Sequence, residues 1–235
     1  MGRIFKYDNK YYDDRKIYKK SSIEINPGVT IFIGCNGSGK STLIEIIKDD
    51  LKESGTPYYL YDNFKEGGSK RASVRASFGM ESIVNALLIN QLSEGEQINA
   101  NIIDMGKDLF QYIESGASEE DQRMSRISKM LSDNYKEKVD PEHDQRWFLF
   151  DAIDSGYSID NVVDFKEYIL KPLIRQCAKH GKEAYIVVVA NEYEMTVGEQ
   201  SFNVVDGKYV DVSTYEKYKK QILKTREYKE KRDGD

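Results

Sequence analysis

The chain has 235 residues, of which 39% are hydrophobic and 32% charged, so it is long enough to bury a substantial core as one large globular domain. No apolar run approaches the ~18 residues of a membrane-spanning helix, and the first ten residues contain no apolar signal core. With a net charge of −5 and only Cys35 and Cys177, which lack metal-ligand spacing, we expect a cytoplasmic, reduced protein without membrane insertion.

The first quarter of the chain alternates between short strands and a helix. The apolar run at 29–33 suits a buried central strand, and the glycine-rich stretch that follows leads into a helix with one apolar face. The predicted elements are strands over 4–7, 22–25, 29–33 and 58–61 and a helix over 41–52.

Further along, apolar strands alternate with longer helical patterns. Asp206-Gly207 between two short strands is a hairpin signal. The predicted elements are helices over 80–92, 94–113 and 162–180, strands over 147–150, 184–190, 202–205 and 209–212, and a charged helix from Thr214. This alternation predicts an α/β fold with a mainly parallel sheet and N-terminal antiparallel strands.

The domain organisation follows from composition. We interpret residues 1–235 as a single domain with a small helical subdomain over 62–115 and a charged arm over 116–145. Residues 1–20 carry a net charge of +4 and residues 214–235 a net charge of +3, which leaves −12 for the middle. Basic ends can contact nucleic acid or acidic partners, but the pattern favours solvated faces and a frayed basic helix or tail over 214–235.

The glycine-rich stretch has the chemistry of a phosphate-binding loop. It fits the P-loop pattern between a strand and a helix, where backbone N–H groups and the helix N-terminus attract phosphate. Lys40 is expected to reach the β- and γ-phosphates, and the Ser41 hydroxyl is expected to bind Mg²⁺. The predicted ATP-binding residues are Gly34, Asn36, Gly37, Ser38, Gly39, Lys40, Ser41 and Thr42.

A second motif opens the helix predicted at 94. Taken alone, Ser93 followed by Glu96 is a capping box. The sequence LSEGEQ, from residue 92, resembles the signature motif of the ABC class of ATPases, and INPGVTIFIGCNGSGKSTL resembles the same class around its P-loop. The resemblance implies an ABC-type P-loop NTPase core that forms an ATP-dependent homodimer. In it, Ser93 and Gly95 would contact the γ-phosphate of ATP held by the opposite subunit.

The apolar strand at 147–150 ends in Asp151, which matches a metal-organising carboxylate. Lys40 and Asp151 are therefore the candidate catalytic residues, and Ser41 and Asp151 the candidate Mg²⁺ ligands. Asp154-Ser155-Gly156 then resembles the D-loop of the ABC class.

The chain departs from the ABC pattern at three positions. Ala152 stands where the family has a glutamate that polarises the attacking water, and Asn191 stands where it has a switch histidine. The expected glutamine is also missing after the strand at 58–61. ATP hydrolysis is therefore expected to be slow, if the chain is an ATPase. Asp154, Glu192 or Glu194 could replace the base, and no spacing argument selects one.

The position of adenine is left open among three tyrosines. ABC proteins often stack adenine on an aromatic residue upstream of the P-loop, and the candidates here are Tyr11, Tyr12 and Tyr18. For any single tyrosine, a place in the core or on the surface is the simpler interpretation.

These features favour a soluble, non-transporter branch of the ABC class, as a compact relative of the RecF/SMC-like ATPases. The 53 positions between Lys40 and Ser93 are few for the transporter branch, so the subdomain that docks on a membrane partner looks shortened. The leading hypothesis is an ATP-dependent dimerisation switch coupled to a partner protein or nucleic acid. The alternatives are a nucleotide-binding regulatory module that does not hydrolyse ATP and an ABC transporter ATPase subunit.

Overall fold

The computed structural model describes residues 2–8, 16–62, 106, 108–117, 142–154 and 158–234. Several predictions fall outside these residues. They are the helix over 80–92, most of the helix over 94–113, most of the arm over 116–145, and the signature-like motif with Ser93 and Gly95.

The centre of the molecule is a six-stranded sheet with the order β4-β5-β6-β3-β7-β8. All neighbouring strands are parallel except β8, which pairs antiparallel with β7. The strands are β3 (Gly28–Ile33), β4 (Tyr58–Asp62), β5 (Gln145–Asp151), β6 (Glu183–Val189), β7 (Gln200–Asn203) and β8 (Lys208–Val210). A separate antiparallel pair is formed by β1 (Arg3–Lys6) and β2 (Ser22–Ile25). The predicted mainly parallel α/β fold with N-terminal antiparallel strands is confirmed.

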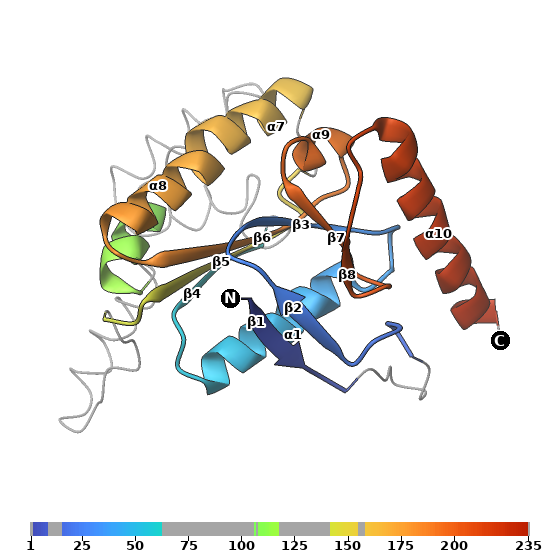
Figure 1. The fold of residues 1–235 in the computed structure, drawn as a ribbon, viewed down its shortest axis with the longest axis horizontal. Coiled ribbons are helices and arrows are strands. Elements are labelled where there is room, and N and C mark those ends of the chain that lie inside the picture. The colour runs from blue at the N-terminus through green and yellow to red at the C-terminus, as the bar shows by residue number, and fades with distance from the viewer. Residues whose placement is uncertain are drawn as a thin grey trace, which may run out of the picture.

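Helices cover both faces of this sheet (Figure 1). The described helices are α1 (Lys40–Glu53), α7 (Ile159–Phe165), the π-helical η1 (Lys166–Leu170), α8 (Lys171–Lys179), α9 (Tyr193–Thr196) and α10 (Tyr215–Gly234). Residues 108–115 are also helical. Figure 1 shows α7 and α8 on one face, α1 with β1 and β2 on the other, and α10 beyond β7 and β8.

The helix predicted over 162–180 is interrupted by the π-helical segment η1. Pro172 lies in the first turn of α8, and a proline has no N–H to continue the α-helical hydrogen-bond pattern. The sequence pattern did not indicate this change in helical geometry.

Alternation along the strands divides the core between the two faces. Phe148 and Phe150 of β5 pack toward α7 and α8, whereas Trp147 and Leu149 pack with α1 and β2. Burial on both sides explains why the central strands are continuous apolar runs rather than alternating ones.

The predicted hairpin around Asp206-Gly207 forms, but its loop is longer than the two-residue signal suggests. Asn203 pairs with Lys208, so four residues connect the strands. The Asn203 side chain accepts hydrogen bonds from the backbone N–H groups of Val205 (3.1 Å) and Asp206 (3.0 Å), and Gly207 adopts a φ of 61°. The Asn203 side chain thus stabilises a four-residue connection, where the sequence signal predicts a two-residue turn.

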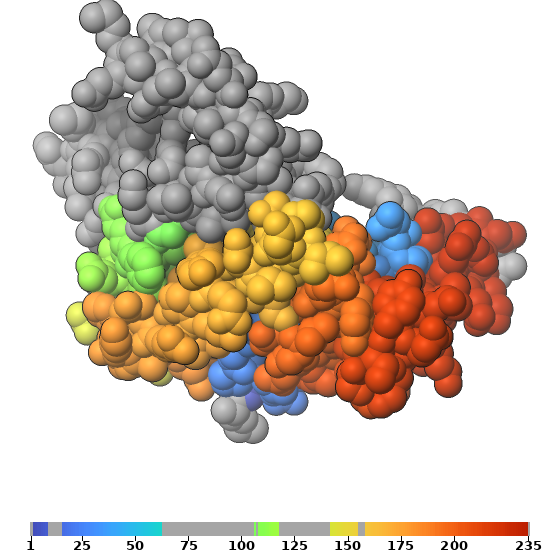
Figure 2. Space-filling view, turned by 90° about the horizontal axis from the view of Figure 1, so that it is seen from above, coloured from blue at the N-terminus to red at the C-terminus, as the bar shows by residue number. Residues whose placement is uncertain are grey.

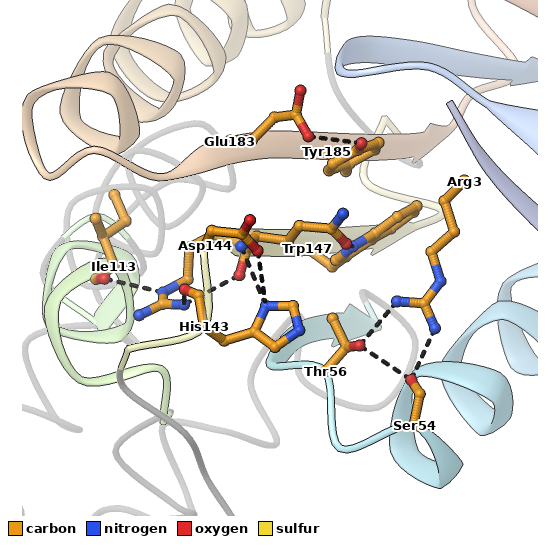
Figure 3. Close-up of polar contacts among 11 residues, drawn as sticks. Arg3, Ser54, Thr56, Ile113, His143, Asp144, Trp147, Glu183 and Tyr185 are labelled. Carbon is orange, nitrogen blue, oxygen red and sulfur yellow. Dashed lines mark hydrogen bonds and ion pairs between the residues drawn. The ribbon is translucent and has the colours of Figure 1, made fainter. Parts of the chain in front are cut away.

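Polar contacts gather around the amino ends of the parallel strands, and some of their groups are buried (Figure 3). The fully buried guanidinium of Arg146 donates to the carbonyls of Ile113 (3.0 Å) and His143 (2.7 Å). Trp147 stacks on Tyr185 with ring centroids 4.3 Å apart. Arg3 donates to the hydroxyls of Ser54 and Thr56, both at 2.7–2.8 Å, and so ties β1 to the end of α1.

Candidate functional site

The phosphate loop, residues 34–42, leaves the carboxyl end of β3 and enters α1. Gly37 and Gly39 have φ values of 76° and 95°, a region that favours glycine. Gly39 is also the N-cap of α1 and has no side chain to satisfy the N–H groups of the first turn. These groups therefore face the loop as hydrogen-bond donors at the positive end of the helix dipole.

Lys40 closes the loop in this structure. Its buried Nζ donates to the carbonyl oxygens of Gly34 (2.7 Å) and Cys35 (3.4 Å). Burial lowers the pKa of the Lys40 ammonium, and the charges of Asp154 and Asp151 oppose that shift. A buried ammonium between loop carbonyls and carboxylates is suited to hold a polyanion.

The loop also contains a buried hydroxyl without a hydrogen-bond partner among the described residues. This atom is Ser38 Oγ, and Ser38 is only 1% exposed. A buried hydroxyl without a partner is costly, and a phosphate oxygen would satisfy it. Together with the open N–H groups of α1 and Lys40, it makes the cradle fit a nucleotide phosphate.

The tertiary structure brings Ser41 and Asp151 together across 110 positions of sequence. The Ser41 hydroxyl donates to Asp151 Oδ1 at 3.0 Å. Burial raises the pKa of Asp151, and the nearby charge of Asp62 adds to the shift, while the bond from Ser41 opposes it. Carboxylate and hydroxyl oxygens are ligands that Mg²⁺ prefers, and a bound cation would favour the ionised Asp151.

Few protein ligands are available for this cation. The part of the chain that the structure describes contains no group of three His, Cys, Asp or Glu side chains that could hold a metal ion. Mg²⁺ usually keeps waters and substrate phosphates as its other ligands, so Ser41 and Asp151 would be enough protein ligands to hold it. When bound, it would neutralise phosphate charge.

The residues after β5 pack inside the molecule and connect two of its loops. Ala152 is buried and has a φ of 52°, the only positive φ of a non-glycine residue in the described part of the chain. Asp154 is also buried, and its Oδ2 accepts hydrogen bonds from the backbone N–H groups of Asn191 (2.6 Å) and Glu192 (2.8 Å). Asp154 thus links the chain after β5 to the chain after β6.

Tyr18 supports the phosphate loop, and its position is incompatible with adenine stacking in this structure. The side chain is fully buried, and its hydroxyl donates to the Gly39 carbonyl at 2.7 Å. Its ring also packs edge-on against Tyr7. Tyr11 and Tyr12, the other candidates for stacking, lie outside the described residues.

The structure therefore places Lys40, Ser41 and Asp151 near one another, and their roles toward ATP and Mg²⁺ stay a prediction. The predicted contacts Ser93 and Gly95 and the D-loop residues Ser155 and Gly156 lie outside the described residues. Sequence reasoning missed three residues of α10 that contact the loop, namely Thr225, Lys229 and Arg232. Nothing in the charged pattern of this helix marks them.

Comparison with known proteins identifies the family. Residues 18–145 match the model of the ABC transporter family, which places the phosphate loop and the signature-like motif inside the matched region. The chain belongs to this family. It is an ABC ATPase nucleotide-binding domain, and its cofactors are ATP and Mg²⁺, which the residues of the phosphate loop and Asp151 fit.

Two solved structures are similar to the chain at low identity. One is a nucleotide-free ATP-binding cassette from an ABC transporter, with 14% identity, 90% of each chain covered and a TM-score of 0.44. The other is the ADP conformation of an ATP-binding cassette of an ABC transporter, with 15% identity, 96% of this chain and 98% of that chain covered, and a TM-score of 0.44. No curated protein matches the sequence. No helix in the described ranges is long and apolar enough to cross a membrane.

Proposed function

We propose that the chain is an ATP-dependent dimerisation switch that hydrolyses ATP slowly and signals to a partner protein or nucleic acid. The observation that carries the nucleotide part of this proposal is the 3.0 Å contact between Ser41 and Asp151 beside Lys40. It supports a site in which the phosphate loop and the strand-end carboxylate act on one Mg-ATP.

The dimer part of the proposal depends on the signature-like motif. Ser93 and Gly95 open a predicted helix, and a helix start with a serine and a glycine is an anion site. In the ABC arrangement, the signature of one subunit meets the ATP held by the phosphate loop of the other. Two such sites form a closed symmetric assembly in which ATP is part of the interface.

Slow hydrolysis is supported by the residues at the ends of β5 and β6. Ala152 carries no carboxylate to orient water, and Asn191 carries no imidazole. The same observations favour a second candidate function, a regulatory module that binds ATP without turnover. Phosphate release from the purified chain distinguishes the two.

Family membership also fits an ABC transporter ATPase subunit. The 53 positions between Lys40 and Ser93 favour the switch, because they leave little room for the subdomain that docks on a membrane partner. Co-purification of the chain with a membrane permease would instead support the transporter function.

The direct test is light scattering of the purified chain with Mg-ATP, with ADP and without nucleotide. We expect a dimer with Mg-ATP and a monomer in the other two conditions. Ser93→Arg places a bulky side chain where the partner's γ-phosphate must approach, so it should abolish the dimer and leave ATP binding intact. Ser22→Arg, on an exposed position of β2, is the matched control and should dimerise like the wild type.

Two results would contradict the dimer proposal. One is a wild-type chain that binds ATP but stays monomeric in all three conditions. The other is a folded Ser93→Arg variant that still dimerises with ATP. A lower melting temperature without selective loss of assembly would indicate that Ser93 acts only as a helix cap.

A further inference from the structure

The C-terminal helix α10 lies along the outer side of the phosphate loop. Figure 2 shows the red surface of α10 directly beside the blue surface of the segment that contains the start of α1. Two anchors fix the helix along its length. The Tyr218 hydroxyl donates to the Asn191 carbonyl at 2.6 Å, and the Lys224 ammonium contacts Asp206 at 2.5 Å. The helix therefore extends from the end of β6 to the phosphate loop.

One contact between α10 and the loop involves a buried threonine. Thr225 is 1% exposed, and its Oγ1 accepts a hydrogen bond from the backbone N–H of Cys35 at 2.9 Å. The same hydroxyl donates to the carbonyl of Ile222 at 2.8 Å within the helix. Because its hydrogen is directed to Ile222, a lone pair of Oγ1 faces Cys35. The geometry is thus specific for a hydroxyl at this position.

Two basic side chains of α10 contact the next two residues of the loop. Lys229 Nζ donates to the Asn36 carbonyl at 3.1 Å, and Arg232 donates to the Gly37 carbonyl at 3.3 Å. Lys229 also lies so close to Gly37 that a Cβ there would be 2.9 Å from Nζ. In a phosphate loop the N–H groups turn toward the anion, so carbonyls on the outer side need other partners. Lys229 and Arg232 supply donors on that side.

We propose that α10 is part of the nucleotide site, with Thr225, Lys229 and Arg232 as positioning residues that hold the phosphate loop in its ATP-binding shape. The inference rests on ATP binding by the loop and is independent of dimerisation. Holding the Asn36 and Gly37 carbonyls on the outer side, and the Cys35 N–H on Thr225, fixes the shape of the loop and leaves the uncapped N–H groups at the start of α1 available for phosphate. A loop that is already ordered does not lose backbone conformational entropy when ATP binds, which favours binding.

The bonds of Lys229 and Arg232 to the loop are exposed to solvent and can be removed individually, whereas Thr225 is buried and needs a substitute of the same shape. A cavity of about 820 Å³ lies between the loop and the helix, lined by Cys35 and Asn36 on one side and by Arg226 and Lys229 on the other. Because the helix is not sealed against the loop, substitution of Lys229 leaves no void in the core.

The decisive variant is Thr225→Val, which keeps the β-branched shape but leaves the Cys35 N–H without its acceptor. We expect ATP affinity measured by calorimetry to fall about tenfold, and Thr225→Ser, which retains the hydroxyl, to restore it. Amide hydrogen exchange at Cys35 should become faster in Thr225→Val and stay slow in Thr225→Ser. Lys229→Met should weaken ATP binding about threefold. Lys231→Met, an exposed lysine in the same turn, is the matched control and should leave it unchanged.

Several outcomes would overturn the inference. Wild-type ATP affinity in Thr225→Val means that the helix does not position the loop, and a higher affinity means that it inhibits binding. A melting temperature that falls while ATP affinity is unchanged shows a purely structural role. Dimerisation separates this inference from the proposed function: Thr225→Val should still dimerise once ATP exceeds its weaker dissociation constant. A wild-type chain that binds ATP but stays monomeric contradicts only the switch.

Discussion

The two ends of the parallel strands, called here the amino edge and the carboxyl edge of the sheet, differ in how some of their buried polar groups are hydrogen-bonded. At the amino edge, the guanidinium of Arg146 and the indole of Trp147 are hydrogen-bonded within the protein. At the carboxyl edge, Ser38 Oγ and Asp154 Oδ1 are buried without a partner among the described residues, and Ala152 has a disfavoured backbone conformation. Tyr7 Oη, next to β1, and Ser201 Oγ, within β7, also lack a partner among the described residues, but they lie outside the loops of the carboxyl edge. It is therefore the combination of unsatisfied groups with the backbone strain of Ala152 that marks this edge as the place where a ligand binds. The difference assigns structure to one edge and nucleotide chemistry to the other.

The largest expected effect concerns catalysis at the carboxyl edge. The purified chain supplied with Mg-ATP should turn over far below the ~10 s⁻¹ median of enzymes. The reason is that Ala152 provides no general base, and the loss of one typically costs 10²–10⁴-fold. Steady-state phosphate release measures this rate, with Lys40→Ala as the background control. A rate at or above that median would show that another carboxylate acts as the base.

At the amino edge, Arg146→Leu should destabilise the fold without changing the affinity for ATP. It leaves buried carbonyls without their donor, so the free energy of unfolding should fall by about 3 kcal/mol in denaturant titrations. ATP affinity at a temperature where the variant is folded should stay within about twofold of wild type. Arg175→Leu, at an exposed position of α8, is the control and should change neither quantity appreciably. A parallel loss of ATP affinity would remove the distinction between the edges.

Lys40→Ala should have the reverse pattern. Its ammonium balances phosphate charge in the cradle, so we expect ATP affinity to fall at least tenfold, or about 1.4 kcal/mol. The melting temperature should change less than it does for Arg146→Leu. Lys52→Ala, in the last turn of the same helix, provides the matched control. Calorimetry that gives equal ATP affinity for Lys40→Ala and wild type would refute the assignment of Lys40.

The smallest expected effect concerns Asp206. This residue lies at the carboxyl edge, but its carboxylate is hydrogen-bonded within the protein, as the polar groups Arg146 and Trp147 are at the amino edge. Its carboxylate accepts from Lys19 at 2.7 Å and Lys224 at 2.5 Å. Burial alone would raise the pKa of Asp206, but the bonds from the two lysines outweigh it and the pKa lies below its usual value.

A carboxylate with a lowered pKa in the folded state stabilises the protein above its unfolded pKa, and this contribution is lost as the pH falls through the folded pKa. Asp206→Asn should therefore cost about 1 kcal/mol of unfolding free energy at pH 7, and the difference should shrink as the pH falls below about 4 and disappear once the pH is below the lowered pKa of the folded state. Denaturant titrations at pH 7 and at an acid pH below that pKa measure the difference in unfolding free energy, with exposed Asp49→Asn as the control. A difference that persists in acid would mean that the charge is not responsible.

Much of the fold and part of the site were predictable from the sequence. The strands at 29–33 and 184–190 were recognisable because burial on both faces requires continuous apolar runs, and each prediction ends within one residue of the structure. Lys40 and Ser41 were recognisable because phosphate binding needs glycines, a helix start and a cation in consecutive positions. The four-residue turn after Asn203 was not, because the bonds of its side chain depend on the local backbone.

The buried contacts of the C-terminal helix could not be predicted from the sequence. Its high charge indicated a solvated helix or frayed tail, yet α10 continues through Gly234 and buries Tyr218 and Thr225. The charged residues along a helix indicate that most of its surface is exposed to solvent. They do not indicate the few positions where a hydroxyl or an ammonium group bonds to a segment far away in the sequence.

The sequence by itself determined the ATP-binding chemistry, because the phosphate loop is continuous and its N–H groups, glycines and lysine act over a few residues. Only the tertiary structure decided that Tyr18 supports Gly39 from inside the core and that Thr225 holds Cys35 from 190 residues away. Such contacts depend on how strands and helices pack, and a hydrogen bond requires its atoms to be placed within a few tenths of an ångström. Local sequence patterns define which elements form and leave that placement to the fold.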